Sequence, residues 1–161
     1  MIFVTVGNAT QSFARLLEAV DDLSGKGAFH GEPVFMQTGH NPQFKPRHGQ
    51  AEAFIPMEAC QARMKEARLI ISHGGCGTLL QAIGLGKTPV VMPRLSRYRE
   101  HVNDHQLQLV RALAEEGRIV PAFEAADLPC AIEEAWQRKH QPPPKGPMLE
   151  LVGEAIKELL I

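Results

Sequence analysis

The sequence is poor in cysteine and shows no excess of charge of either sign. Its three cysteines, Cys60, Cys76 and Cys130, are widely spaced and none belongs to a CxxC pair, so a zinc ribbon or a thioredoxin-type redox site is not expected. Such a small, odd number of cysteines fits the reducing cytosol. The 17 basic and 18 acidic side chains give a net charge of −1, without the basic excess that is typical of domains binding duplex DNA.

Long apolar runs are absent as well. No stretch of about 18 consecutive apolar residues occurs, so the sequence predicts no membrane-spanning helix. Residues 1–7 lack the basic flank and the long apolar run of a signal peptide. We therefore expect a cytoplasmic protein that reaches a membrane only through its surface or through a partner.

What the sequence does contain is an alternation of short apolar runs with amphipathic segments. Of its 161 residues, 44% are hydrophobic and 22% are charged, which is typical of one globular domain. Strands are predicted at residues 2–6, 33–37, 51–55, 69–72, 89–92 and 118–121. Helices are predicted at residues 11–23, 56–67, 101–116 and 126–138, and another runs from a glycine loop at 73–78 to residue 85. This order predicts an α/β fold with a doubly wound, Rossmann-like parallel sheet.

The C-terminal part of the chain differs in composition. Residues 141–147, QPPPKGP, contain three consecutive prolines and predict a stiff spacer. Residues 148–161 carry Leu149, Val152, Ile156 and Leu159 at helical spacing. The apolar face of this amphipathic helix either folds back on its own domain or docks on another protein. The predicted organisation is a ligand-binding domain over residues 1–140, a spacer over 141–147 and a possible partner-docking helix over 148–161.

The most informative motif is SHGGCGT at residues 72–78, between a buried strand and a helix. Glycines there let the backbone approach a ligand, and the free N–H groups at a helix start favour an anion such as diphosphate. His73 and Thr78 can add side-chain donors. The motif matches neither a Walker loop nor GxGxxG. A tight turn with a core histidine is the plain alternative, but three glycines and a threonine in six residues favour an anion site.

Two further motifs follow predicted strands, where ligands bind in such sheets. GNATQS, residues 7–12, opens a helix and offers polar side chains, although Thr10 or Ser12 could simply cap that helix. If the 7–12 and 73–78 loops follow adjacent strands, they could clamp one diphosphate from both sides. NDHQ, residues 103–106, contains an Asp and a Gln, which suit sugar hydroxyls because each can form paired hydrogen bonds; capping by Asp104 is the alternative.

Other charged residues give weaker signals. His101 and His105 lie four apart on a predicted helix, but no third metal ligand is evident, so we expect no metal site. Residues 40–50 are expected to form a mobile, solvated loop. The three arginines of residues 94–100, Arg94, Arg97 and Arg99, could neutralise phosphate or lipid head groups, or belong to a solvated basic loop.

Four segments taken together resemble a known family. They are MIFVTVGNATQSF (1–13), ISHGGCGT (71–78), GKTPVVMP (86–93) and RYREHVNDHQ (97–106). In this order and spacing they are similar to the C-terminal, donor-binding domain of glycosyltransferase family 28. The resemblance covers about residues 1–121. It is nearest to small stand-alone catalytic subunits of two-part glycosyltransferases, which include bacterial exopolysaccharide glucuronosyl- and galactosyltransferase subunits and the eukaryotic dolichol-linked GlcNAc transferase subunit.

The resemblance implies one half of a GT-B glycosyltransferase that transfers a sugar from a UDP-sugar to a lipid-linked acceptor, without an essential metal. It also implies a membrane-anchored, acceptor-binding partner subunit, which would hold this chain at the inner face of the membrane and supply the base that activates the acceptor. Two alternatives are a non-catalytic regulatory module that binds nucleotide sugars and an epimerase, although the latter would need a longer, two-domain chain.

The family's functional residues can be carried over position by position. The diphosphate contacts would fall on Gly7, Asn8, Thr10 and Gln11 and on His73, Gly74, Gly75, Gly77 and Thr78. The uracil contacts would fall on Phe54, Ile55 and Met57, and the sugar contacts on Asp104 and Gln106. His73 and Thr78 would act in catalysis by stabilising the charge that develops on the diphosphate as the sugar–phosphate bond breaks.

Two positions depart from the family pattern. Relatives usually carry a Glu for the ribose hydroxyls where this chain has Gln81, and an amide loses the charge-assisted bonds that a carboxylate makes. Arg99 stands where the nearest relatives are expected to have a small residue.

Overall fold

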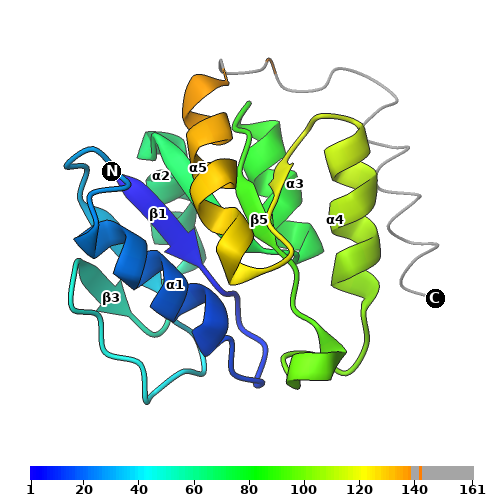
Figure 1. Ribbon diagram of the computed structural model, residues 1–161, viewed down its shortest axis with the longest axis horizontal. Coiled ribbons are helices and arrows are strands. Elements are labelled where there is room, and N and C mark those ends of the chain that lie inside the picture. Colours follow the sequence, from blue (N-terminus) through cyan, green and yellow to red (C-terminus); the bar gives the residue numbers. More distant parts are fainter. Residues whose placement is uncertain (139–141, 143–161) are drawn as a thin grey trace.

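The centre of the molecule is a parallel sheet, seen in the computed structural model, which describes residues 1–138 and 142 (Figure 1). Its six strands lie in the order β3-β2-β1-β4-β5-β6, and every neighbouring pair is parallel. The strands are β1 (Ile2–Thr5), β2 (Val34–Gln37), β3 (Gln50–Glu52), β4 (Leu69–His73), β5 (Val90–Met92) and β6 (Val120–Pro121). The predicted doubly wound, Rossmann-like α/β fold is confirmed.

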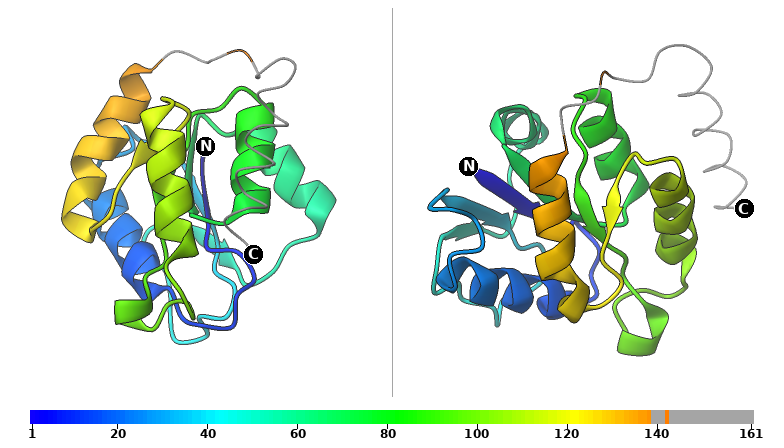
Figure 2. Two further views of the ribbon diagram at one scale, coloured as in Figure 1. Left: turned by 90° about the vertical axis from the view of Figure 1, so that its right-hand side faces the viewer. Right: turned by 45° about the horizontal axis from the view of Figure 1, so that its top comes forward.

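Helices cover both faces of this sheet. They are α1 (Ala14–Gly25), α2 (Met57–Glu66), α3 (Cys76–Gly84), α4 (His105–Glu115) and α5 (Leu128–Gln137), with short 3-10 turns at Ser96–Tyr98 and Ala125–Asp127. Seen edge-on, α1 and α5 lie on one side of the strands and α2 and α3 on the other (Figure 2). α4 packs against α3 and β5 in one buried apolar cluster.

Both faces of the sheet are buried, and this explains the near-continuous apolar runs in the strands. Side chains alternate along β1: Ile2 and Val4 pack with α1 and α5, whereas Phe3 packs with α2. The same alternation holds in β4, where Ile71 packs on the side of α1 and α5 and Ile70 on the side of α2.

The strand order creates one special place at the carboxyl edge of the sheet. From β1 the chain builds outward through β2 and β3, and then returns to build β4, β5 and β6 on the other side. The neighbouring strands β1 and β4 are therefore followed by connections that diverge, and such a switch point leaves a crevice where ligands bind. Thr5 pairs with Ser72 at the ends of these strands, so the 7–12 and 73–78 loops do follow adjacent strands.

Several predicted elements are shorter than expected, and two of them show a structural reason. The third strand ends at Glu52 because its neighbour β2 ends at Gln37 and the chain then turns at Gly39, which has φ +54 and still donates to the Ala53 carbonyl. The helix expected from residue 101 begins at His105, because the Asn103 side chain accepts a hydrogen bond from the His105 N–H, 3.1 Å away. His101 and His105 therefore do not share a helical face.

The loop over residues 40–50 is held to α1 at two points. The Asn41 side chain, 5% exposed, accepts a hydrogen bond from the Phe13 N–H and donates one to the Thr38 carbonyl. Near the other end, the buried Asp21 carboxylate accepts hydrogen bonds from the N–H groups of Arg47 and His48. The loop is thus anchored to the helix that begins behind the 7–12 loop.

The division of the chain into three parts stays a prediction. The spacer at 141–147, apart from residue 142, and the helix expected at 148–161 lie outside the described residues. Within the described part of the chain, no helix is long and apolar enough to cross a membrane.

Arg99 is held in a left-handed backbone conformation, with φ +57, directly after the 3-10 turn Ser96–Tyr98. Of the small residues that the family resemblance leads us to expect there, glycine adopts this conformation without strain. A left-handed non-glycine residue costs roughly 1–2 kcal/mol.

We predict that Arg99→Gly raises the free energy of unfolding by about 0.5–1 kcal/mol, because the relief of strain exceeds the extra freedom of glycine in the unfolded chain. Urea denaturation measures this. As the matched control, Arg97→Gly lies within the 3-10 turn and should lower stability. Equal or lower stability of Arg99→Gly would contradict the explanation.

Candidate functional site

The side chain of His73 lies between two loops at the switch point. We call residues 7–12, after β1, the first glycine loop, and residues 73–78, after β4, the second glycine loop. A Cβ atom added at Gly75 would sit 2.1 Å from the His73 Nε2, and one added at Gly7 would sit 2.5 Å from the same atom. Any side chain at either position would collide with the imidazole, and Gly7 also has φ +72. The ring thus connects the loop after β1 with the loop after β4.

The surroundings of His73 keep its ring neutral. Burial, and secondarily the positive charge of Arg94, lower the pKa of His73 to about 4, against the opposite effect of a hydrogen bond with the Thr5 main chain. At neutral pH the imidazole therefore carries one N–H and one acceptor nitrogen. Its fixed position makes it part of the wall of the site, with no net charge before a ligand binds.

The start of α3 presents main-chain donors that the protein does not use. Gly75 occupies the N-cap without a side-chain cap, and the first helical bond runs from the Leu79 N–H to the Gly75 carbonyl. Among residues 1–138 and 142, no hydrogen bond takes up the N–H groups of Gly75, Cys76, Gly77 or Thr78. Unpartnered N–H groups at a helix start form a site for an anion.

Gly77 differs from the other glycines of this motif. Packing within the protein accounts for Gly7, Gly74 and Gly75, since a Cβ at Gly74 would lie 2.9 Å from the Gln106 Cβ. A Cβ at Gly77, by contrast, would meet no atom within 4 Å. The side of α3 above Gly77 is open, which leaves the backbone there accessible to a ligand.

The loop after β1 offers a second set of free polar groups. Asn8 and Thr10 are exposed and Gln11 is half-buried, and their side chains make no hydrogen bond with the described residues. Ser12, the other cap candidate, is used internally, because its hydroxyl donates to the Asn41 side chain and lies 3.4 Å from the Ala14 N–H. The three free side chains, on the strand next to the glycine motif, remain candidates for ligand contacts.

The two candidate sugar contacts already have partners on the protein. Gln106 accepts hydrogen bonds through Oε1 from the N–H groups of Gly74 and Arg94, each at 3.1 Å. Asp104 does not cap α4 with its side chain; its Oδ1 accepts a hydrogen bond from the Ser96 N–H at 2.8 Å. Gln106 therefore has only its NH₂ group left to offer a ligand, whereas Asp104 keeps its second carboxylate oxygen.

The candidate nucleoside contacts lie beyond β3. Phe54 is 49% exposed and its ring makes an edge contact with His40, with the centroids 4.9 Å apart. A cavity of about 400 Å³ lies beside Phe54, under the 38–46 loop. Met57 is exposed, and its sulfur accepts a hydrogen bond from the Gln81 amide at 3.5 Å. Ile55 packs against the apolar cluster below α2. Gln81, expected to contact ribose, is thus placed beside an expected base contact.

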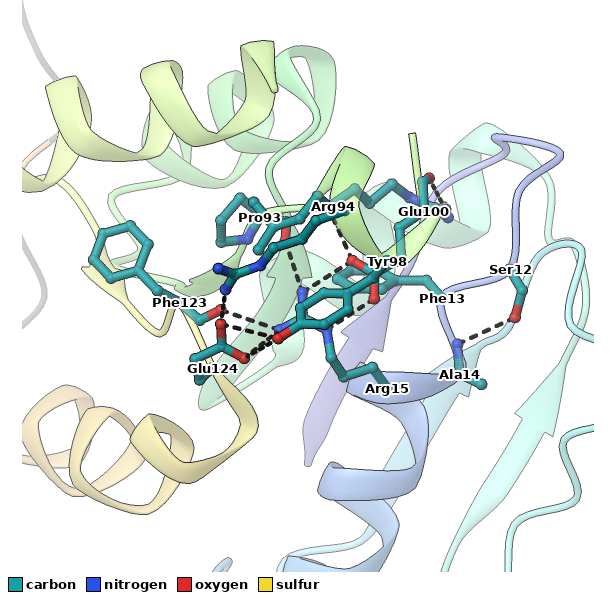
Figure 3. Close-up of polar contacts among 12 residues, drawn as sticks. Ser12, Phe13, Ala14, Arg15, Pro93, Arg94, Tyr98, Glu100, Phe123 and Glu124 are labelled. Atoms are coloured by element: carbon teal, nitrogen blue, oxygen red, sulfur yellow. Dashed lines mark hydrogen bonds and ion pairs between the residues drawn. The ribbon is translucent and has the colours of Figure 1, made fainter. Parts of the chain in front are cut away.

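One functional arrangement was not expected from the sequence. Arg94 is fully buried, so it neither forms part of a solvated loop nor reaches head groups. Its guanidinium contacts main-chain carbonyls around the first glycine loop. Arg15 and Glu100 form a largely buried ion pair nearby (Figure 3). Arg97 pairs with Glu124 at the surface. Three arginines close together look alike in sequence, and nothing there marks Arg94 as the buried one.

Comparison with known proteins identifies the family. The sequence model of the glycosyltransferase family 28 C-terminal domain matches residues 1–159. The chain belongs to this family. The human "UDP-N-acetylglucosamine transferase subunit ALG13" is 29% identical over 125 residues, which is 73% of this chain and 10% of that protein. The mouse protein of the same name is 28% identical over 127 residues, with the same coverage. The chain thus spans about a tenth of the length of these curated relatives.

Solved structures establish the same fold for this family 28 domain. An NMR solution structure of ALG13 superposes with a TM-score of 0.66 at 20% identity, covering 97% of this chain and 96% of that one. The glycotransferase of kitacinnamycin gives 0.61 at 14% identity, covering 99% and 38% of the two chains. The calicheamicin glycosyltransferase CalG4 gives 0.58 at 18%, covering 98% and 37%. The family 28 domain described here has the Rossmann-like fold of the C-terminal half of GT-B glycosyltransferases.

The open space above Gly77 leads to a prediction with opposite effects on stability and binding. We expect Gly77→Ala to keep stability or raise it by up to about 1 kcal/mol, because alanine favours a helix. Its methyl group should lower the affinity for UDP at least about tenfold by blocking approach to the free N–H groups. Thermal unfolding and calorimetric titration measure the two effects.

Gly84→Ala is the matched control, since Gly84 lies at the other end of α3 and its Cβ would also meet no atom within 4 Å. This variant should gain stability and bind UDP like the parent. Unchanged UDP affinity in Gly77→Ala would contradict a diphosphate site at the start of α3.

Proposed function

We propose that this chain is the donor-binding, catalytic subunit of a two-component glycosyltransferase. It would transfer a sugar from a UDP-sugar to a lipid-linked acceptor in polysaccharide or glycan biosynthesis. The single observation that carries the proposal is the pair of loops around His73: two sets of unused donors follow neighbouring strands at the switch point, where ligands bind in such sheets. Family 28 membership supports it, as does the name "UDP-N-acetylglucosamine transferase subunit" of the human relative.

The proposed chemistry is electrostatic. When the bond between sugar and diphosphate breaks, negative charge grows on the diphosphate, and donors fixed in advance lower the barrier without having to reorganise. The N–H groups at the start of α3 and the hydroxyl of Thr78 would act in this way at one loop, and Asn8, Thr10 and Gln11 at the other. His73 fixes the separation of the loops. No metal is needed in this scheme, since the donors themselves offset the charge.

The remaining parts of the reaction are assigned to a partner. We propose a membrane-anchored subunit that binds the acceptor and supplies the base for its hydroxyl, and that holds this chain at the inner face of the membrane. Sugar transfer would then require both subunits, whereas donor binding would require this chain alone. Donor binding without transfer, measured with the partner and acceptor present, would support the non-catalytic regulatory alternative instead.

The diphosphate assignment is tested by titrating the intact chain with UDP, UDP-GlcNAc, UDP-glucuronate and UDP-galactose. We expect Thr78→Ala to weaken UDP binding about tenfold, the value of a hydrogen bond to a charged group. His73→Ala should weaken it further, because the spacing of the loops is lost. Ser24→Ala, at the far end of α1, is the control and should bind like the parent. If both Thr78→Ala and His73→Ala bound UDP like the parent, the diphosphate would not bind at these loops.

Gln81 gives a test of the nucleoside end of the site. Gln81→Glu should tighten UDP binding about fivefold, because a carboxylate makes stronger hydrogen bonds to the ribose hydroxyls than an amide does. The gain should vanish with 2′,3′-dideoxy-UDP. Gln61→Glu adds the same charge on the facing helix α2 and should not tighten binding. An equal gain with the dideoxy ligand would show that Gln81 does not face the ribose.

A further inference from the structure

Arg94 is the side chain that reaches both ends of the first glycine loop. Its Nη2 donates to the Val6 carbonyl at 2.8 Å, directly before Gly7, and its Nη1 donates to the Gln11 carbonyl at 2.7 Å, at the end of the loop. Nη1 also contacts the carbonyl of Glu100 at 3.1 Å. One guanidinium thus connects the two ends of the first glycine loop through hydrogen bonds.

The same residue is joined to the second glycine loop through its main chain. The Arg94 N–H and the Gly74 N–H share one acceptor, the Oε1 atom of Gln106, at 3.1 Å each. The two loops that face the crevice are therefore connected twice: directly by the ring of His73, and behind the site by Arg94 and Gln106.

The direction of these contacts matters for an anionic ligand. A trans peptide places its carbonyl oxygen and its N–H on opposite sides. Because the Val6 and Gln11 carbonyls point at the buried guanidinium, their oxygens are kept away from the crevice, where they would repel a diphosphate. The N–H that follows Gln11, on Ser12, is turned away from Arg94 and makes no hydrogen bond within the described residues.

The buried charge of Arg94 is not explained by a contribution to folding stability. Arg94 is 0% exposed, its Nε has no partner among the described residues, and no carboxylate pairs with it directly. Burial lowers the pKa of Arg94 to about 10, partly offset by the charge of Glu100. A buried charge of this kind costs several kcal/mol, and well-packed apolar replacements are often neutral or stabilising. The ring of Phe13, 4.9 Å from the guanidinium carbon, provides a partial compensation.

A second layer of charges holds Arg94 in its place (Figure 3). Glu100, 4% exposed, accepts hydrogen bonds from the Leu95 N–H and from Nε and Nη2 of Arg15. Arg15 in turn donates to the carbonyls of Pro93 and Phe123. These contacts join the start of α1 to the segments that follow β5 and β6, and they fix the turn that carries Arg94.

We propose that Arg94 is a positioning residue that fixes the first glycine loop, with its carbonyls turned inward, at the distance from the second loop that a diphosphate requires. The proposal rests on the donor site proposed above. Arg94 touches no ligand in this scheme; it acts through the main chain of residues 7–11 and through Gln106.

The test compares Arg94→Met, which keeps the length of the side chain without its donors, with Arg94→Lys, which keeps a cation but not the planar fork. The control is Arg97→Met, in the same segment but exposed and paired with Glu124. The first measurement needs no ligand: amide hydrogen exchange of the intact chain by NMR. We expect exchange of the Gly7 and Phe13 amides, which donate to Thr5 Oγ1 and Asn41 Oδ1 at the two ends of the loop, to rise at least tenfold in Arg94→Met, less in Arg94→Lys and not at all in the control, while β1 keeps its protection.

The second measurement compares UDP with uridine, which lacks the phosphates. In Arg94→Met the affinity for UDP should fall at least tenfold and that for uridine less than twofold, with Arg94→Lys in between. A general loss of stability would weaken both ligands alike. If Arg94→Met does not fold, Arg94→Lys gives both comparisons.

The two measurements separate the role of Arg94 from the proposed donor site. Unchanged exchange of the Gly7 and Phe13 amides would overturn the positioning role whatever the ligand does, and so would an equal loss of UDP and uridine binding. If the parent chain binds neither ligand, the proposed function fails, while the exchange data still decide whether Arg94 holds the loop.

Discussion

The packing of the His73 ring between Gly7 and Gly75 is the contact on which the arrangement of the site depends. It is possible only because β1 and β4 are neighbours, with Thr5 opposite Ser72 at their ends. The ring fills the space that side chains at both glycines would need, so two loops that are over 60 residues apart in sequence reach a common geometry. The N–H groups at the start of α3 and the polar side chains of residues 8–11 thus lie at the same edge of the sheet, after adjacent strands.

The charges around the two loops also favour an anionic ligand. Burial holds His73 neutral, so the groups that can attract an anion here are main-chain N–H groups, the helix start and the buried charge of Arg94. Such fixed donors suit a ligand whose negative charge increases during the reaction, because they need no rearrangement as the charge develops. Arg15, paired with Glu100, also donates hydrogen bonds to carbonyls in the segments after β5 and β6, and so holds these segments to the start of α1.

Much of the fold could be predicted from the sequence. Buried strand residues such as 69–71 are uniformly apolar, and glycines lie at or just after the ends of α1, α3 and α4, so the alternation of strand and helix and the glycine motif at a strand end were evident. The start of α4 was not, because Asn103 ends the preceding turn with a side-chain hydrogen bond that competes with the helix. The role of Arg94 was missed because burial of an arginine depends on carbonyls contributed by distant segments. Likewise, the Oε1 of Gln106 is occupied by two main-chain N–H groups that no local pattern reveals.

We propose that the two glycine loops bind one diphosphate together. Amide chemical shifts of the ¹⁵N-labelled intact chain, followed during titration with UDP and in parallel with pyrophosphate, measure this. We expect both ligands to shift the amides of residues 7–12 and 75–78 with a single affinity for each ligand, and UDP alone also to shift those around Phe54 and Gln81. Shifts confined to one loop, or different affinities at the two loops, would contradict a shared diphosphate site.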